Sequence, residues 1–266
     1  MNYLSNKNMK NPLISIITVV YNNVGSLEET ILSIIGQTYK NIEYIIIDGK
    51  STDGTIDVVK KYEDKIAYWI SEADGGIYDA MNKGLRNATG DWICFINAGD
   101  GLADKNVIQN IYDKSFFRNE QVDVLYGDSV VIYNDLRKKM FYARKPIKYL
   151  WKGPVFRHGA MFVRRSLHQA HPFRLDNRYK ICADFDLIYH LFVDKFKFLY
   201  VDEIIMYFEQ DGISNNRIRC AKDNKMVVSF YTPNIVYSVW HNVHILRAYF
   251  IDLFIKPILK ILSINI

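Results

Sequence analysis

The chain is poor in cysteine and lacks the spacings with which cysteine builds metal or disulfide sites. Its 266 residues include three cysteines, Cys94, Cys182 and Cys220, which stand far apart. No CxxC or Cys/His ligand spacing is present, so the sequence supports neither a disulfide framework nor a zinc site. The segment Met1–Lys10 has no apolar core, so we expect no signal peptide, a disordered N-terminus over residues 1–11 and a reducing cytoplasm.

The usual glycine motifs for phosphate binding are also missing. The loop Gly49-Lys50-Ser51 follows an apolar run, yet it matches neither GxGxxG nor GxxxxGK[ST]. This excludes a dinucleotide-binding fingerprint and a P-loop at that position.

Acidic residues are absent from a long internal stretch. There is no Asp or Glu between Leu136 and Leu175, although the net charge of the whole chain is only +5. Its cations between Arg137 and Arg165 are Arg137, Lys138, Lys139, Arg144, Lys145, Lys148, Lys152, Arg157, Arg164 and Arg165. Such a stretch attracts phosphates, anionic lipid headgroups or nucleic acid, or it forms an ordinary solvated surface.

What the sequence does contain is an alternation of strand and helix patterns. Short apolar runs occur at Leu13–Val20, Asn41–Asp48, Ile66–Ile70 and Asp91–Ile96. Helical patterns separate them: one after Ser26, which is the expected N-cap, one from Thr55 to Tyr62 and one from Gly76 to Ala88. This order predicts right-handed crossovers and an α/β fold, with a mostly parallel sheet flanked by helices.

Polar side chains stand where three of these runs end, namely Thr18 with Tyr21, Asp48, and Asn97 with Asp100. Parallel strands place their C-terminal ends along one edge, so these side chains should meet there. That edge suits a nucleotide, with carboxylates for its base or ribose and Asp100 for a divalent metal on its phosphates. The alternative is ordinary turn chemistry, because Asn, Gly and Asp favour turns.

The second half is less regular. Its predicted elements are a strand at Val122–Ile132 broken at Gly127-Asp128, a loop entering a strand at Arg157–Val163, a polar linker at Asp176–Ala183, a helix opening at Asp184, and strands at Phe196–Val201 and Ile204–Phe208.

Five segments together resemble family 2 glycosyltransferases, most closely the bacterial O-antigen and capsule members. They are Leu13–Asn22, Ile45–Thr55, Asp74–Gly84, Asn97–Asp100 and Ala183–Leu187, and they occur in the order typical of that family. The resemblance implies the GT-A fold, a nucleotide-sugar donor, commonly a UDP-sugar, a divalent metal (Mn²⁺ or Mg²⁺) and inversion at the anomeric carbon. It implies a GT-A domain over residues 12–212, with a nucleotide-binding half (12–100) and an acceptor half (101–212), followed by a helical tail over 213–266.

The resemblance also implies a role for each matching residue. Thr18, Tyr21 and Asp48 would hold the nucleoside, and Asp74 and Asn82 would lie beside the ribose or the sugar. Asp100 would hold the metal, and Asn97 would contribute a neutral oxygen. His158 would line the acceptor side, and Asp184 would be the catalytic base. Two positions depart from the family pattern. The segment Asn97–Asp100 keeps one carboxylate, and Gly49 stands where an aspartate is frequent.

An inverting reaction needs a carboxylate that takes the proton of the attacking hydroxyl. Asp184 and Asp186 are both candidates, but on a helix they lie about 200° apart, so only one can face a cleft. We choose Asp184 because the first turn borders the linker; the alternative is that Asp184 is only a helix N-cap.

The tail is apolar from Val243 to Ile264, but Arg247, Asp252, Lys256 and Lys260 interrupt it. A spanning helix needs about 20 mostly uncharged residues, so we expect a helix lying in the membrane interface. The alternative is a helix packed on the protein itself or on a second subunit.

The expected partners are a nucleotide sugar, a glycan or polyprenyl-diphosphate-linked acceptor and the inner face of the cytoplasmic membrane, with no nucleic acid. The competing functions are a nucleotidyltransferase of similar fold and a non-catalytic, membrane-bound nucleotide-sugar-binding protein.

Overall fold

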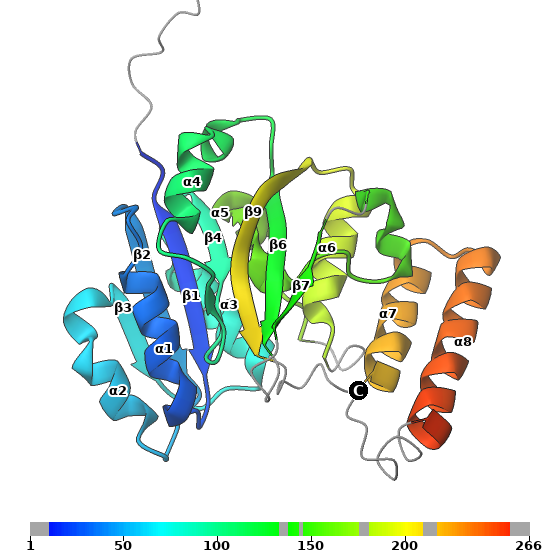
Figure 1. Ribbon diagram of the computed structural model, residues 1–266, viewed down its shortest axis with the longest axis horizontal. Coiled ribbons are helices and arrows are strands. Elements are labelled where there is room, and N and C mark those ends of the chain that lie inside the picture. The colour runs from blue at the N-terminus through cyan, green and yellow to red at the C-terminus, as the bar shows by residue number, and fades with distance from the viewer. Residues whose placement is uncertain (1–10, 133–137, 144–145, 176–180, 210–216, 256–266) are drawn as a thin grey trace, which may run out of the picture. The chain divides into compact units, whose positions relative to one another are not determined.

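The structure, a computed structural model, describes residues 11–132, 138–143, 146–175, 181–209 and 217–255 (Figure 1). Apart from Asn11, the predicted disordered N-terminus lies outside the described residues. The chain divides into two compact units, which we describe separately. The first comprises residues 1–144, 156–172 and 196–209, and the second comprises residues 145–155, 173–195 and 210–266. This grouping differs from the predicted domain and tail, whose boundaries remain predictions.

The first unit is built around one sheet. Within the described residues the sheet has nine strands, in the order β3-β2-β1-β4-β8-β6-β9-β5, with β7 paired to β6. The strands are β1 (Ile14–Val20), β2 (Ile42–Asp48), β3 (Tyr68–Ser71), β4 (Trp92–Phe95), β5 (Gly101–Leu102), β6 (Val124–Ile132), β7 (Lys138–Phe141), β8 (Met161–Arg164) and β9 (Phe198–Glu209). The first four strands are parallel, as predicted, and β8 runs antiparallel to both β4 and β6.

Helices cover both faces of the parallel strands. They are α1 (Val24–Ile35), α2 (Thr55–Lys61), α3 (Ile77–Asn87), α4 (Val107–Asp113) and α5 (Arg165–Ala170). Every residue of β1 is buried, and alternate residues of the strand point to opposite faces. Ile14 and Ile16 join one core cluster with Leu27 of α1. On the other face α3 approaches so closely that a Cβ at Gly84 would lie 2.4 Å from Ile17 Cγ2. The mostly parallel sheet with flanking helices is therefore confirmed.

Two local predictions were wrong. The first helix begins at Val24 after Asn23, so Ser26 is not its N-cap. The two strands predicted between Phe196 and Phe208 form one long strand, β9, which pairs with β6 through an irregular register between Tyr126 and Ser129. That irregularity coincides with the break predicted at Gly127-Asp128.

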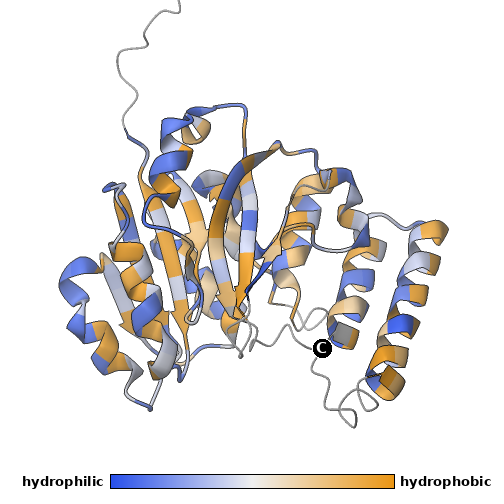
Figure 2. Cartoon of the chain, viewed as in Figure 1, coloured by the Kyte–Doolittle hydropathy of each residue, from blue (hydrophilic) through white to orange (hydrophobic). Residues whose placement is uncertain are grey.

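The second unit is helical in its described part. Its elements are η3 (Ile147–Lys152), α6 (Ala183–Val193), α7 (Arg217–Tyr231), α8 (Ile235–Phe250) and the π-helical turn η6 (Ile251–Ile255). Helices α7 and α8 lie side by side, and the last turns of α8 are coloured apolar in Figure 2. The ring of Trp151 in η3 stacks on Tyr237 of α8 at 4.3 Å between centroids. Among the described residues, no helix has the length and apolar character needed to cross a membrane.

Candidate active site

The register of the parallel strands brings their C-terminal ends level with one another. Val20 pairs with Asp48, and Asp48 pairs with Ser71 on the next strand. On the other side of β1, the amide of Ala98 donates to the carbonyl of Val19 at 3.2 Å. The loops that follow β1, β2, β3 and β4 therefore share one edge of the sheet, which we call the carboxyl edge.

Asp48 lies at this edge but is completely buried. Its Oδ2 accepts hydrogen bonds from the amide of Ser51 at 2.9 Å and from Ser71 Oγ at 2.6 Å, while its Oδ1 accepts one from Ser51 Oγ. This carboxylate therefore fixes the loop after β2 to the end of β3. A contact between Asp48 and a nucleobase stays a prediction.

Thr18 is also buried and bonded within the sheet. Its hydroxyl donates to the carbonyl of Ile96 at 2.6 Å and accepts from Tyr44 Oη at 3.1 Å. In this structure Thr18 links β1 to the residue after β4. Its predicted role with the nucleoside remains untested.

Tyr21, in contrast, is 65% exposed at the carboxyl edge. The next residue, Asn22, adopts a positive φ of 46° and is held from both sides. Its amide donates to Ser51 Oγ at 2.7 Å, and its Oδ1 accepts from the amide of Thr52 at 2.8 Å. The backbone beside Tyr21 is thereby fixed, while its ring remains open to a ligand.

Gly49, Tyr21 and Asp74 converge at one point. A Cβ built on Gly49 would lie 2.7 Å from Asp74 Oδ2 and 3.3 Å from Cδ2 of Tyr21. Asp74 Oδ1 accepts from the amide of Gly76 at 2.8 Å, and within the described part of the chain Oδ2 has no hydrogen-bond partner. Gly49 departs from the family pattern here because the carboxylate of Asp74 occupies the space that a side chain would take.

The loop that carries Asp74 is tied to α3. Lys83 Nζ donates to the carbonyl of Ala73 at 2.8 Å and pairs with Glu72 Oε1 at 2.8 Å. Asn82, the residue before it, is buried on the same helix. Sequence reasoning did not assign Lys83 a role, although Lys83 lies inside one of the matching segments.

The loop after β4 presents the predicted metal-binding residue. Thr30 of α1 anchors this loop, because its hydroxyl donates to the carbonyl of Asp100 at 2.7 Å and accepts from the amide of Gly99 at 3.0 Å. Gly99 has a φ of 98°, which favours glycine. Asn97 Oδ1 is buried without a hydrogen-bond partner in the described residues.

These oxygens fit a divalent cation only in part. Hard cations take oxygen ligands, and Mg²⁺ is commonly held by one or two carboxylates together with substrate phosphates. Asp100 would supply the carboxylate, and the unpartnered Oδ1 of Asn97 is an available neutral oxygen. No cluster of three or more His, Cys, Asp or Glu suited to a metal occurs among the described residues. A cation here would therefore depend on ligands from the donor.

Comparison with known proteins agrees with this geometry. Residues 15–173 match the family described as Glycosyl transferase family 2. The chain belongs to this family. An uncharacterized glycosyltransferase of Mycobacterium tuberculosis is 40% identical over 59% of this chain, and the match spans 60% of that relative's length. A PGL/p-HBAD biosynthesis glycosyltransferase of Mycobacterium bovis is 31% identical over 78% of this chain and 81% of its own length.

Solved structures of glycosyltransferases share the fold. S. aureus TarS in complex with UDP-GlcNAc superposes with a TM-score of 0.66 at 15% identity, over 93% of this chain and 77% of that chain. The mannosyltransferase PcManGT from Pyrobaculum calidifontis, in complex with GDP-Man and Mn²⁺, gives a TM-score of 0.62 at 15% identity, over 93% and 88% of the two chains. At this identity the likeness establishes the GT-A fold and nothing finer.

The predicted acceptor residue of this family 2 chain, His158, lies in an aromatic layer. Its ring stacks on Phe95 of β4 at 5.4 Å between centroids, and His168 approaches the same ring at 5.5 Å. Burial lowers the pKa of His158 to about 4 and the pKa of His168 to about 3, so both are neutral at pH 7. The predicted role of His158 toward an acceptor remains a prediction.

The two candidate base residues of the second unit differ in environment. Cys182 is the N-cap of α6 and makes no side-chain cap bond, so Asp184 lies inside the first turn and is not the cap. Asp184 is half-buried, whereas Asp186 is buried and its Oδ2 lies 3.7 Å from Arg174 Nε. This contrast favours Asp184 as the accessible carboxylate, and its role as base stays a prediction.

Proposed function

We propose that this chain is an inverting glycosyltransferase that moves a sugar from a nucleotide sugar, a UDP-sugar in the first instance, to a hydroxyl of a lipid-linked glycan. The reaction belongs to the synthesis of a bacterial surface polysaccharide. One observation carries the proposal: an exposed aromatic ring, an open carboxylate oxygen and the Asp100 loop share the carboxyl edge of the sheet. This is the edge where open α/β sheets bind ligands.

Tyr21 and Asp74 would recognise the nucleoside. The exposed ring of Tyr21 offers a stacking surface for a base, since aromatic faces stack on every nucleobase. The open Oδ2 of Asp74 accepts a hydrogen bond from a base N–H or a ribose hydroxyl beside that ring. Asp48 then acts through the loop that it holds, because three donors of the chain already engage its oxygens.

The cation is part of the proposal. Asp100 and Asn97 would hold it together with the donor diphosphate, and a bound divalent ion neutralises charge on the leaving diphosphate. One carboxylate makes this a weak site in the absence of donor. The Mn²⁺ in the PcManGT complex supports a metal in this fold.

Asp184 would take the proton from the attacking hydroxyl. A hydroxyl is a poor nucleophile, so a carboxylate within hydrogen-bond reach is needed to remove its proton as the bond to the anomeric carbon forms. We place the enzyme at the inner face of the cytoplasmic membrane, where a polyprenyl-diphosphate-linked acceptor is found. The name of the M. bovis relative, a PGL/p-HBAD biosynthesis glycosyltransferase, supports an acceptor of the glycolipid class.

A thermal-shift screen tests the proposal. UDP-sugars, GDP-sugars and free nucleotides are added with Mn²⁺, with Mg²⁺ or with a chelator. A ligand present at a concentration 100 times its Kd should stabilise the fold by about 2.7 kcal/mol. We expect stabilisation by at least one nucleotide sugar, with a larger shift when the metal is present. Asp100→Ala should remove the metal-dependent part and leave the rest.

Asp104→Ala is the matched control, since this exposed aspartate caps a turn away from the edge. No stabilisation by any nucleotide sugar, with or without metal, would refute the function. Unchanged metal dependence in Asp100→Ala would refute the metal site alone.

A further inference from the structure

Helix α8 carries an apolar stripe that the described residues of the second unit leave exposed. Its large apolar side chains on one side are between 54% and 77% exposed. They are Ile235, Val236, Val239, Val243, Leu246 and Phe250. At 3.6 residues per turn these positions fall within an arc of about 100°. Leu253 and Phe254 of η6, which are 65% and 56% exposed, extend the apolar surface beyond the helix.

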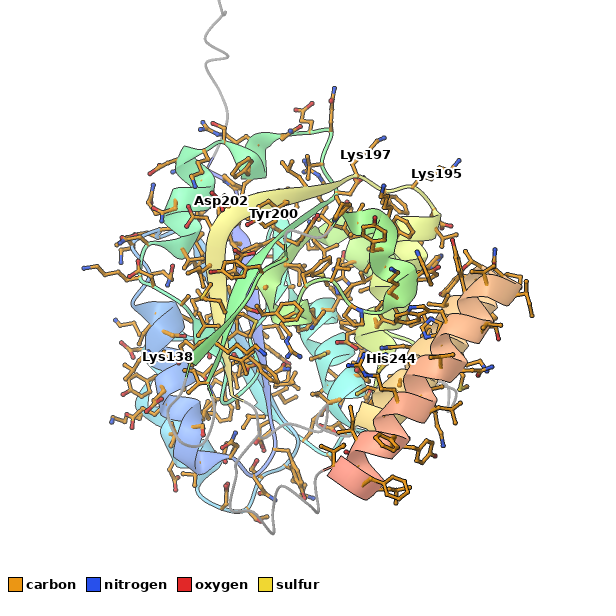
Figure 3. The ribbon with its side chains drawn as sticks, turned by 45° about the vertical axis from the view of Figure 1, so that its right-hand side comes forward. Lys138, Lys195, Lys197, Tyr200, Asp202 and His244 are labelled. Carbon is orange, nitrogen blue, oxygen red and sulfur yellow. The ribbon has the colours of Figure 1, made fainter. Side chains whose placement is uncertain are left out.

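The border of this stripe on the side of η3 combines cations with aromatic rings. Lys152 Nζ of η3 lies 5.1 Å from the ring centroids of both Tyr149 and Trp151. On α8 itself, Trp240 stacks on His244 at 5.1 Å, and Figure 3 labels His244 on this helix. Indole and phenol rings with lysine beside them are the side chains enriched at the headgroup level of membranes.

The opposite border has the same composition. Lys222 Nζ of α7 lies 5.3 Å from the ring centroid of Tyr249, and Lys225 Nζ donates to Asn242 Oδ1 at 2.6 Å. The stripe therefore runs between two rows of cations, one from η3 and one from α7.

Acidic residues are absent from η3 and α8, and Asp252 is the acidic residue of η6. Neither Ile147–Lys152 nor Ile235–Phe250 contains an Asp or Glu, whereas they contain Lys148, Lys152 and Arg247. The one acidic residue of α7, Asp223, is buried, and its Oδ2 accepts from the amide of Ile181 at 3.3 Å. A surface of this kind is complementary to an apolar layer edged by phosphates.

We propose that this surface, the α8 face, docks the enzyme on an anionic lipid bilayer. The α8 face consists of the stripe on α8 and η6 and its two cationic borders. The apolar side chains enter the acyl boundary while the lysines and Arg247 meet lipid phosphates. The inference rests on the proposed function only for the lipid-linked acceptor that makes a membrane position useful.

A second copy of the chain fits the α8 face less well. The spacing from Val236 through Val239, Val243 and Leu246 to Phe250 alternates by three and four residues, as in a helix pair. Helix pairs of this kind place opposite charges beside the seam. Here both borders are cationic and the helix carries no acid, so a second copy offers no partner for Arg247 or the lysines.

Cosedimentation of the full chain with vesicles tests the proposal. We expect binding to vesicles of phosphatidylcholine with phosphatidylglycerol, at least tenfold weaker binding to phosphatidylcholine alone, and weakening at high salt. Leu246→Glu with Val243→Glu should reduce binding to the anionic vesicles at least tenfold. Both positions are exposed, so the fold should be kept, and circular dichroism checks this. Leu32→Glu, at an exposed leucine of α1, is the matched control and should bind as wild type.

The outcomes separate the two proposals. Absence of wild-type binding to anionic vesicles overturns the docking surface, and so does equal binding by the double variant. Concentration-dependent dimers that the double variant loses would assign the face to a second copy and also overturn it. Nucleotide-sugar stabilisation is measured on the same samples, so a failure of donor binding with intact vesicle binding refutes the proposed function and leaves the surface standing.

Discussion

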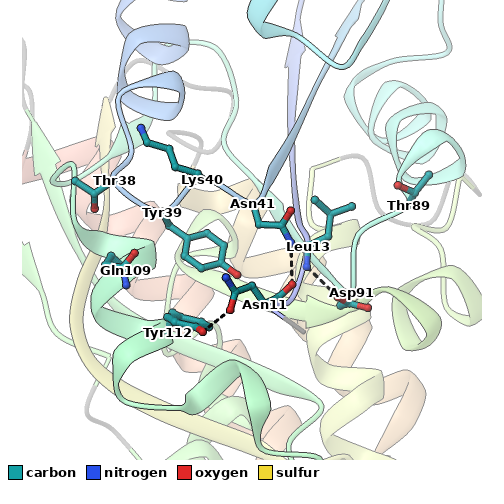
Figure 4. Close-up of a pocket in the computed structure, with 10 residues that line it drawn as sticks. All are labelled: Asn11, Leu13, Thr38, Tyr39, Lys40, Asn41, Thr89, Asp91, Gln109 and Tyr112. Carbon is teal, nitrogen blue, oxygen red and sulfur yellow. Dashed lines mark hydrogen bonds between the residues drawn. The ribbon is translucent and has the colours of Figure 1, made fainter. Parts of the chain in front are cut away.

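The two edges of the parallel sheet carry similar polar side chains and use them differently. At the amino edge, Tyr39 Oη donates to the carbonyl of Pro12 at 2.6 Å, and Asp91 Oδ2 accepts from the amide of Leu13 at 2.9 Å. These bonds join strand ends around a hollow of about 900 Å³ (Figure 4). At the carboxyl edge, Asp74 Oδ2 and Asn97 Oδ1 have no such partner in the described residues. This hollow therefore lies where polar groups such as Tyr39 Oη and Asp91 Oδ2 have hydrogen-bond partners, whereas the two unpartnered oxygens lie at the other edge.

The unpartnered oxygens at the carboxyl edge agree with the proposed site, whereas the volume of the hollow at the amino edge does not point to it. A buried polar group without a partner costs free energy, so a fold that keeps one has a reason to do so. Strand direction points the same way, because ligands bind outside the carboxyl ends of parallel strands. Substitutions at the carboxyl edge should thus impair binding, and substitutions at the amino edge should impair stability alone.

The largest effect is expected where a half-buried and a buried carboxylate, Asp184 and Asp186, stand two residues apart. Asp184→Asn keeps the shape of the side chain and removes the proposed base, so turnover should fall by about 10²-fold or more while donor binding stays at the wild-type level. Asp186→Asn weakens the pairing with Arg174 in the interior of its unit, and it should cost about 1–3 kcal/mol of unfolding free energy. Steady-state kinetics and urea titrations measure the two effects. Wild-type turnover in Asp184→Asn would move the base elsewhere, with Asp186 the next candidate.

A second test uses two glycines at the carboxyl edge. A methyl group at Gly49 would lie 2.7 Å from Asp74 Oδ2, so Gly49→Ala should displace that carboxylate and weaken nucleotide binding roughly tenfold, a loss of about 1.4 kcal/mol. At Gly75 the nearest atom, Cβ of Asp79, would be at 3.7 Å, an ordinary contact. Gly75→Ala is therefore the matched control. Calorimetry with UDP compares the two, and equal affinities would contradict the proposed role of Asp74.

The sequence predicted the edge correctly because strand direction follows from local patterns. Apolar runs and their polar ends placed Tyr21, Asp48 and Asp100 at the ends of parallel strands, and the structure confirms those positions. The sequence could not show which carboxylate is satisfied. Asp48 accepts from Ser71, which lies 23 residues away, and no local pattern reveals such a bond.

The start of α1 was mispredicted for the same reason. Ser26 has the right residue type for an N-cap, but Asp53 Oδ2 accepts from the amide of Val24 at 3.0 Å and satisfies the helix end from another loop. Likewise, polar residues usually end a strand, yet β9 runs unbroken past Asp202 and Glu203. These two residues have no partner on β6, but β6 pairs with β9 on both sides of them, at Tyr200 and at Ile204. Both errors arise where a distant segment supplies the hydrogen bonds.

A third test concerns two buried histidines, His158 and His168. The pKa of His158 is lowered to about 4 and that of His168 to about 3 by burial, whereas an unfolded histidine titrates near 6.5. As the pH falls, the unfolded state therefore binds protons before the folded state does. The contribution of the two histidines to stability should be fully present above about pH 6.5 and should fall as the pH drops toward 4. Each histidine contributes up to about 1.4 kcal/mol per pH unit. Melting temperatures from pH 7.5 to 4.5 measure the slope, which His158→Gln should reduce.

The smallest effect is expected at the amino edge. Tyr39→Phe removes the hydroxyl that donates to the carbonyl of Pro12 in a buried position, so unfolding free energy should fall by about 1 kcal/mol. Nucleotide binding and turnover should not change, because this hydroxyl only joins strand ends at the amino edge. Tyr112→Phe is the control, since its hydroxyl donates to Asn11 Oδ1 at an exposed position and its loss should cost less. Urea denaturation and the donor-binding assay are run on the same preparations. A loss of nucleotide affinity in Tyr39→Phe without a loss of stability would mean that the hollow at the amino edge binds ligand, and the contrast between the two edges would then be wrong.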